Sequence, residues 1–210
     1  MFAGSVLSVW VSDCVLNNNS ATSGRGGVFQ VGYGIRVSAV RTAFDHNRAG
    51  DAGGVMNTEI NDITLSASSC SFNSNSAGGS GGVLCNQRGS VYVTANATTF
   101  ERNRGSSGGV VLAASALVVS LSHSLLTHNT AAQSGGVLLC GSLCQVRALD
   151  CSFSNNIATS GNGGVFDGNG LSVIVARVSF NHNYAGHGGG VMSAWSSNIV
   201  VSLVKSFECI

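Results

Sequence analysis

The sequence predicts an all-β fold, a right-handed, single-stranded parallel β-helix of about seven coils with about 27 residues in each. Three observations support this fold. A Gly-Gly-Val triplet recurs along the chain, a Phe/Leu-x-x-Asn motif recurs with the same period, and a five-residue alternation of apolar and polar residues precedes each motif. A period of this length is typical of solenoids in which each coil stacks on the next.

The Gly-Gly-Val triplets are 27, 28, 27, 27, 28 and 26 residues apart. They end at Val28, Val55, Val83, Val110, Val137, Val165 and Val191. We expect the glycines to adopt positive φ at a tight corner, or to allow close approach of stacked backbones. A phosphate-binding loop would need a helix to start after the glycines. Val-Met-Asn and Val-Leu-Cys, which follow two of the glycine pairs, are poor helix starts.

The alternating segment predicts a strand with one face buried. Its apolar positions lie nine, seven and five residues before each Phe or Leu of the Phe/Leu-x-x-Asn motif. They are Leu7, Val9, Val11; Ile35, Val37, Ala39; Ile63, Leu65, Ala67; Val91, Val93, Ala95; Leu117, Val119, Leu121; Cys144, Val146, Ala148; and Leu171, Val173, Val175. All seven coils share one register, which includes the N-terminal stretch.

The Phe/Leu-x-x-Asn motif predicts a buried aromatic stack and a ladder of amides. Its asparagines are Asn19, Asn47, Asn75, Asn103, Asn129, Asn156 and Asn183. An Asn amide both donates and accepts, so one Asn per coil satisfies turn groups of the coils above and below. The alternative is a polar stripe that binds a ligand. We expect three short strands per coil: one that starts at Gly-Gly-Val, the alternating strand, and one that ends at the Phe.

Two other repeat architectures fit less well. A β-propeller blade has about 40 residues or more. A leucine-rich repeat carries several leucines per unit, whereas valine is the dominant apolar residue here. We expect residues 1–210 to form a single β-helix domain without recognisable caps, as a fragment of a longer chain whose neighbouring coils cover both ends.

The composition argues against two classes of partner, nucleic acids and membranes. Charged residues make up 9% of the chain and the net charge is +1, so no basic patch indicates nucleic acid. No apolar run is long enough for a membrane span. No cofactor motif is present.

The sequence predicts no metal site and no catalytic pair. His46, His128 and His182 share the position before the ladder Asn, but they are three and two coils apart, or about 14 and 10 Å, too far to share a zinc ion. The acids fall at different repeat positions and no long loop builds a cleft. They are Asp13, Asp45, Asp51, Glu59, Asp62, Glu101, Asp150, Asp167 and Glu208.

The cysteines and glycosylation sequons lead to separate predictions. Cys14, Cys70 and Cys151 occupy one inward slot, where free thiols act as small hydrophobes. Cys140 and Cys144 form either a disulfide across a turn or half of a metal site without a second half. Asn18 and Asn96 begin glycosylation sequons.

The outward positions of the alternating strand offer a candidate contact face. Its large or charged members are Trp10, Arg36, Tyr92, Arg147 and Ile174. We expect this face, if any, to meet glycans or surface proteins.

The two recurring motifs, Phe/Leu-x-x-Asn and Gly-Gly-Val, also resemble those of a known family. Phe-x-x-Asn together with a Gly-Gly motif is similar to the passenger repeats of chlamydial polymorphic membrane proteins. Phe44/Asn47, Phe72/Asn75, Phe100/Asn103, Phe153/Asn156 and Phe180/Asn183 match, whereas Val replaces the family's usual Ala after Gly-Gly. The resemblance implies an extracellular or cell-surface stalk or adhesin, without a catalytic residue. The alternative is part of a carbohydrate-active enzyme, because pectate-lyase-like β-helices often carry polysaccharide lyases and hydrolases.

Overall fold

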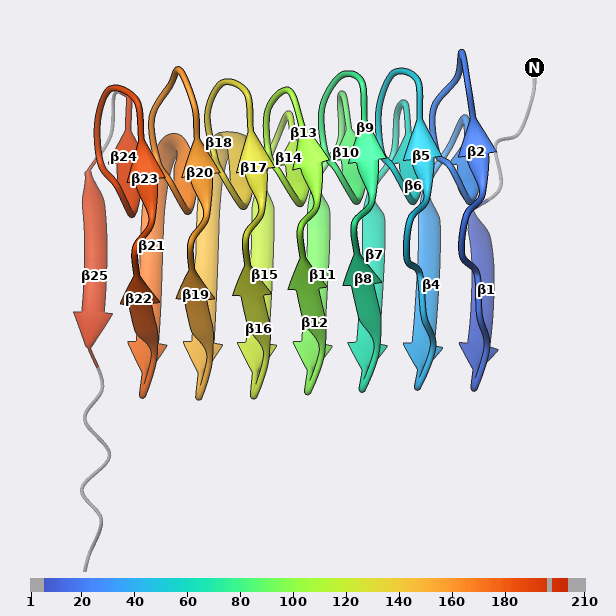
Figure 1. The fold of residues 1–210 in the computed structure, drawn as a ribbon, viewed down its shortest axis with the longest axis horizontal. Coiled ribbons are helices and arrows are strands. Elements are labelled where there is room, and N and C mark those ends of the chain that lie inside the picture. Colours follow the sequence, from blue (N-terminus) through green and yellow to red (C-terminus); the bar gives the residue numbers. More distant parts are fainter. Residues whose placement is uncertain (1–5, 196–197, 204–210) are drawn as a thin grey trace, which may run out of the picture.

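The computed structural model describes residues 6–195 and 198–203, and within them every regular element is a strand. The chain winds into a solenoid in which equivalent strands of successive coils lie side by side (Figure 1). The strand pairings are parallel, for example Leu7 with Ile35 and Phe72 with Phe100. The predicted all-β parallel solenoid of about seven coils is confirmed.

Each coil contains up to four strand segments. The first follows the glycine corner: β3 (Phe29–Val31), β6 (Met56–Thr58), β10 (Leu84–Asn86), β14 (Val111–Ala113) and β24 (Met192–Ala194). The second is the alternating strand: β1 (Leu7–Ser12), β4 (Ile35–Val40), β7 (Ile63–Ser68), β11 (Val91–Asn96), β15 (Leu117–Ser122) and β25 (Ile199–Leu203). In two coils these segments merge into β18 (Leu138–Leu149) and β21 (Phe166–Ala176).

The remaining two segments are shorter and form separate sheets. The third contains the Phe or Leu of the Phe/Leu-x-x-Asn motif, which we call the anchor. These segments are β8 (Ser71–Asn73), β12 (Thr99–Glu101), β16 (Leu125–Thr127), β19 (Ser152–Ser154) and β22 (Ser179–Asn181). The fourth follows the ladder Asn: β2 (Ser20–Ala21), β5 (Arg48–Ala49), β9 (Ser76–Ala77), β13 (Arg104–Gly105), β17 (Thr130–Ala131), β20 (Ile157–Ala158) and β23 (Tyr184–Ala185).

This arrangement differs from the predicted three strands. The third strand does not end at the anchor but is centred on it, as in Ser71–Asn73 around Phe72. An additional two-residue strand follows because the residues after the ladder Asn pair with the next coil, as Arg48 does with Ser76. The prediction was wrong here because two residues are too few to show an alternation.

The core lies inside the solenoid and is filled by one row of side chains per repeat position. In β7, Ile63, Leu65 and Ala67 are buried, whereas Ser66 between them is exposed. The Phe72 ring lies between those of Phe44 and Phe100, with centroid distances of 4.8 and 4.9 Å and nearly parallel planes. Stacked rings bury large apolar areas and fix the vertical alignment of the coils.

The ladder asparagines form a continuous chain of hydrogen bonds. Asn47 donates from its backbone N and its Nδ2 to Oδ1 of Asn75, at 2.9 and 3.1 Å. Asn75 donates in the same way to Asn103, and the pattern extends from Asn19 to Asn183. Five of the seven amides are fully buried. Each is therefore satisfied by its own repeat neighbours instead of by solvent.

Each coil turns through left-handed backbone at three corners. The first glycine of every Gly-Gly-Val pair has positive φ, as Gly53 does at +65°. The second glycine lies against the next coil, and a Cβ on Gly54 would lie 2.1 Å from the carbonyl oxygen of Gly82. The predicted positive φ and close backbone approach are both confirmed, at successive glycines.

The other two left-handed corners carry residues other than glycine. One directly precedes the ladder Asn: Asn18, His46, Ser74, Arg102, His128, Asn155 and His182. The other follows the alternating strand: Asp13, Arg41, Ser69, Ala97, His123, Asp150 and Arg177. Asn, Asp and His are enriched at positive φ, and both corners carry such residues, five at the first corner and three at the second.

The inward slot of Cys14, Cys70 and Cys151 has a polar role that the sequence interpretation missed. The Cys70 thiol donates to the carbonyl oxygen of Ser68 at 3.3 Å, and the Cys14 and Cys151 thiols make the equivalent bond. Thr42, Thr98 and Ser124 occupy the same slot and donate from their hydroxyls in the same way. Thiols and hydroxyls can replace one another in this slot because either donates to the strand's last carbonyl group.

Replacement of one ladder amide tests its energetic role. In Asn75→Ala, the backbone N and Nδ2 of Asn47 lose their acceptor while remaining buried. We expect the free energy of unfolding to fall by about 3 kcal/mol. The control is Asn19→Ala at the exposed first coil, for which we expect a loss of about 1 kcal/mol or less. Urea unfolding followed by circular dichroism measures both, and equal losses would contradict the ladder's role.

The left-handed corner after the alternating strand gives a second prediction. Ala97 has φ of 48°, a conformation that costs a residue with a Cβ about 1–2 kcal/mol. Ala97→Gly removes this strain at an entropic cost of about 0.5–1 kcal/mol, so we expect a net stabilisation of about 0.5 kcal/mol. Ala95→Gly, two residues earlier in a buried strand position, should destabilise the protein by about 1 kcal/mol or more. Opposite signs in thermal unfolding are the expected result.

Candidate functional site

Within the described residues, the outward side of the alternating strands carries no carboxylate. From β1 to β25 the outward positions carry Ser, Thr and a few apolar or amide side chains, with two arginines and two aromatic residues. Trp10 is 77% exposed and Tyr92 is 40% exposed, and Arg36 and Arg147 are also exposed. We call these four residues the contact face.

The register places the four residues in two parallel columns. Arg36 and Tyr92 share one column, and Thr64 lies between them as the partner of both. Two coils separate the two residues, or about 10 Å. Trp10 and Arg147 lie in the other column, whose other members include Ser38 and Ser120. The structure therefore puts these residues on one surface but does not gather them into a single cluster.

A charged cluster that the sequence interpretation missed lies beside the glycine corner. Arg25 donates from Nε to Asp51 at 2.6 Å and from Nη1 to Glu59 at 3.0 Å. Two carboxylates that seemed unrelated in the sequence are thus held by one guanidinium group. The ion pairs Arg25–Asp51, Arg41–Asp13 and Arg177–Asp150 all join residues 26 to 28 positions apart. Opposite charges one repeat apart were the signal that could have revealed them.

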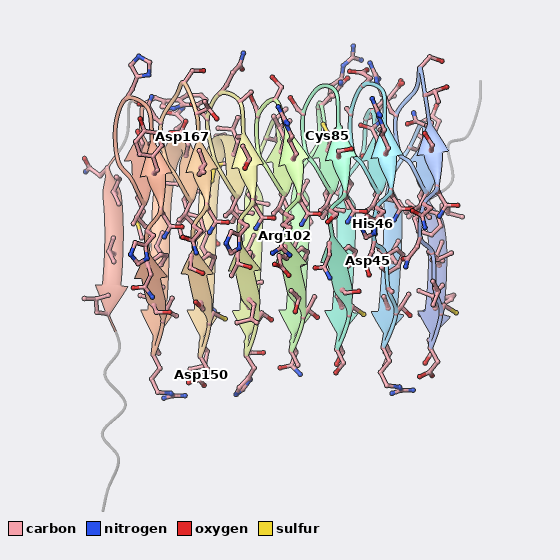
Figure 2. The ribbon with its side chains drawn as sticks, viewed as in Figure 1. Asp45, His46, Cys85, Arg102, Asp150 and Asp167 are labelled. Atoms are coloured by element: carbon pink, nitrogen blue, oxygen red, sulfur yellow. A yellow bond between two sulfur atoms is a disulfide. The ribbon has the colours of Figure 1, made fainter. Side chains whose placement is uncertain are left out.

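Cys85 lies near this cluster, under the glycine corner (Figure 2). The side chain is fully buried, and burial raises the pKa of the thiol to about 12. A thiol that stays protonated is a poor nucleophile. Cys85 therefore adds no reactive group to the arginine and the two carboxylates.

The three repeat-related histidines lie on the corner before the ladder. His46, His128 and His182 are exposed and have φ of 52° to 59°. They occupy equivalent positions of coils that are three and two apart, so their imidazoles do not converge. In the described part of the chain no three His, Cys, Asp or Glu side chains are grouped as metal ligands.

Asp167 is a fully buried carboxyl group in β21, and the acids discussed from the sequence did not single it out. Its Oδ1 accepts from Trp195 Nε1 at 2.9 Å, while Oδ2 has no donor within hydrogen-bond geometry among the described residues. Burial raises the pKa of Asp167 above its ordinary value, against the hydrogen bond from Trp195, which lowers it. Both Asp167 and Cys85 lie below the glycine loops (Figure 2).

The remaining candidates are local. Cys140 and Cys144 form a disulfide with a Cα–Cα distance of 6.0 Å, so the metal half-site is excluded. Both cysteines are buried against Gly168, where a Cβ would lie 2.4 Å from the Cys140 sulfur. Asn18 and Asn96 are exposed, and the Asn96 side chain accepts from the Ser122 hydroxyl at 2.8 Å.

The buried Asp167 predicts a particular pH dependence of stability. Because the pKa of Asp167 is raised in the folded state, folding favours the protonated carboxyl group. Stability is therefore lost as the pH rises from the ordinary pKa of an aspartate through the raised pKa of the folded state. Asp167→Asn keeps an acceptor for Trp195 without a charge. We expect the variant to be more stable than the wild type at pH 7 and to lose that advantage near pH 4. Trp195 fluorescence during urea unfolding measures this, and a variant that is less stable at pH 7 would contradict it.

Comparison with known proteins supports the identification of the repeat unit. Residues 69–87, which contain Phe72, Asn75 and the Gly-Gly-Val of Val83, match the family model of the Chlamydia polymorphic membrane protein repeat. No curated protein and no solved structure matches the chain significantly. No helix in the described residues is long and apolar enough to cross a membrane. The matched unit and the observed solenoid confirm that this chain resembles the polymorphic membrane protein repeats of Chlamydia.

Proposed function

We propose that the chain is a non-catalytic repeat module at the cell surface or outside the cell, an adhesin-like or structural stalk segment that binds glycans or proteins. The observation that carries this proposal is the outward side of the alternating strands, where the exposed aromatic and guanidinium groups of the contact face lie among hydroxyls and, within the described residues, no carboxylates. Flat arrays of this kind suit extended ligands, since each coil adds one row of donors at the same spacing. The similarity to polymorphic membrane protein repeats supports the location.

The solid interior supports a non-catalytic role. In the described coils the Phe or Leu anchors and the inward strand residues pack into one buried hydrophobic cluster, which leaves the outer surface as the place for a ligand. Catalysis would have to take place on the outer surface, in a cleft between loops.

A carbohydrate-active enzyme is the second candidate, and the Arg25 cluster is the observation that favours it. Asp51 and Glu59 lie on either side of one guanidinium group, close enough for a pair of glycosidase carboxylates. However, Arg25 donates to an oxygen of each carboxylate, whereas a general acid must deliver a proton from such an oxygen. The geometry therefore favours an ion-pair bridge between neighbouring coils over an acid/base pair.

Binding to a glycan array and to a panel of extracellular proteins tests the proposal at neutral pH. The variant Trp10→Ser, Arg36→Thr, Tyr92→Thr, Arg147→Ser replaces each residue with one that already occupies the same column in another coil, so it should fold. We expect its affinity for the array ligands to fall about tenfold or more, since aromatic and arginine side chains carry most interface energy.

The control is Leu125→Ser, an exposed position of a different sheet whose equivalent in an earlier coil is Ser71. It should leave binding unchanged. Equal binding by all three proteins would rule out the contact face. Release of new reducing ends from a bound polysaccharide, abolished by Asp51→Asn, would instead support the enzyme.

A further inference from the structure

Two surface hollows share one arginine on the outward side of the alternating strands. Both lie over β18 and its neighbours β15 and β21, which run side by side in the solenoid (Figure 1). The first has a volume of about 270 Å³, and its lining includes Arg147, Ser120, Ser122, Leu149 and Ile174. The second has a volume of about 120 Å³, and its lining includes Arg147, Ile174, Gln145 and Ser172. We call these two the Arg147 hollows.

The register of the strands explains why the surface is hollowed at this place. Arg147 lies between Ser120 of β15 and Ile174 of β21, and Leu149 lies next to Ser122. Neighbouring strands are about 4.8 Å apart, and every second residue points outward. Long side chains beside short ones therefore leave open space between them. The sequence places these short residues around a single guanidinium group.

The guanidinium group of Arg147 is available to a ligand. Its side chain is exposed and forms no ion pair or side-chain hydrogen bond with any described residue. Asp150, the carboxylate closest to it in the sequence, is held by Arg177, whose Nε lies 2.5 Å from Oδ1. An anion that approaches Arg147 therefore meets no fixed negative charge among the described outward residues of this face.

The groups around Arg147 match the parts of an acidic sugar. A guanidinium group can donate two parallel hydrogen bonds to a carboxylate. The hydroxyl of Ser120 and the amide of Gln145 both donate and accept, as the hydroxyls of a sugar require. Leu149 and Ile174 offer apolar surface to the C–H groups of a sugar ring. Pockets for drug-sized molecules have about 300–1,000 Å³, so these smaller hollows suit one unit of a larger glycan.

We propose that the Arg147 hollows hold a sugar residue that bears a carboxylate, an inference that rests on the proposed function and names the ligand class of the contact face. The carboxylate accepts two hydrogen bonds from Arg147, and the ring lies in the larger hollow beside Leu149 and Ile174. Such a carboxylate belongs either to a uronic acid within a polysaccharide or to a sialic acid at the end of a glycan.

Two other classes of ligand fit this face less well. Protein interfaces are depleted in serine, whereas the column of Arg147 contains Ser38, Ser66, Ser120 and Ser202. A nucleic acid binds through several cations along its backbone. The outward side offers Arg36 and Arg147, which are four coils or about 19 Å apart. A single acidic sugar needs one of them.

A third hollow on the same face provides an internal comparison. It has a volume of about 220 Å³, and its lining includes Trp10, Ser12, Ser38 and Val40. It lies five coils from Arg147 along the same column, or about 24 Å away. Its lining is uncharged, so it gives no reason to prefer a charged sugar over an uncharged one. A preference for carboxylates is therefore expected to come from Arg147.

Surface plasmon resonance at pH 7 over four immobilised glycans is the measurement. Sialyllactose and trigalacturonate carry carboxylates, whereas lactose and maltotriose do not. We expect the full chain to bind the carboxylated probes about tenfold or more tightly than the uncharged ones, because hydrogen bonds between charged groups are the strong ones. Arg147→Ser copies Ser120 of the same column and should abolish this preference. Binding of either carboxylated probe supports the inference and identifies the source of the carboxylate.

Three further variants separate the role of Arg147 from general effects. The matched control is R104S, which removes an exposed arginine from β13 in another sheet and copies Ser76, so it should keep the preference. R147K keeps the charge without the planar fork and should restore part of the preference. W10S should weaken the binding of both classes of probe while their ratio stays the same. Circular dichroism checks that each variant is folded.

Three results would overturn the inference: equal wild-type affinity for charged and uncharged probes, an undiminished preference in R147S, or an equal loss in R104S and R147S. Tighter binding of sulfated lactose than of sialyllactose would overturn the carboxylate class. If the fourfold contact-face variant loses its array ligands while R147S keeps the preference, this inference alone fails. If the fourfold variant keeps its array ligands, the proposed function itself fails.

Discussion

In-register stacking is the constraint on which the rest of the structure depends. Each coil's backbone groups pair with those of the coils on either side, so a residue lies directly over its counterpart one repeat away. A polar side chain that recurs in every coil can then find its hydrogen-bond partners in its own counterparts in the neighbouring coils. Asn75 needs an acceptor and a donor in a place that water does not reach, and Asn103 and Asn47 supply them. A single buried Asn in an unrepeated fold would need two different partners.

The same constraint separates positions that are fixed from positions that vary. At the glycine corner a Cβ on Gly53 would meet the carbonyl oxygen of Met56 at 2.1 Å, so the residue has to be glycine. The two other left-handed corners point to solvent and leave room for a side chain. The residues at these two corners have strained, positive φ angles, and their identity differs from coil to coil. Variation in charge therefore collects at the exposed corners, while the interior remains almost uniform.

The sequence was sufficient for the features that repeat in every coil. The period, the inward residues of the alternating strand and the Phe stack all follow from counting. The fourth strand was missed because it is two residues long, and the thiol donor role of Cys70 was missed because a buried Cys is usually apolar. Contacts between unlike residues were also missed. Asp51 and Glu59 have no common repeat position, and only the path of the loops brings both to Arg25.

Asp167 shows why a buried residue that departs from the repeat pattern is hard to predict. Its register partners are Leu139 in the preceding coil and Ser193 in the next, so nothing in the column indicates a carboxyl group. Acid favours the folded state at Asp167, because the neutral carboxyl group is the form that burial tolerates. The hydrogen bond from Trp195 Nε1 joins this carboxyl group to the following coil, so the packing of these two coils is expected to be more stable in acid than at neutral pH.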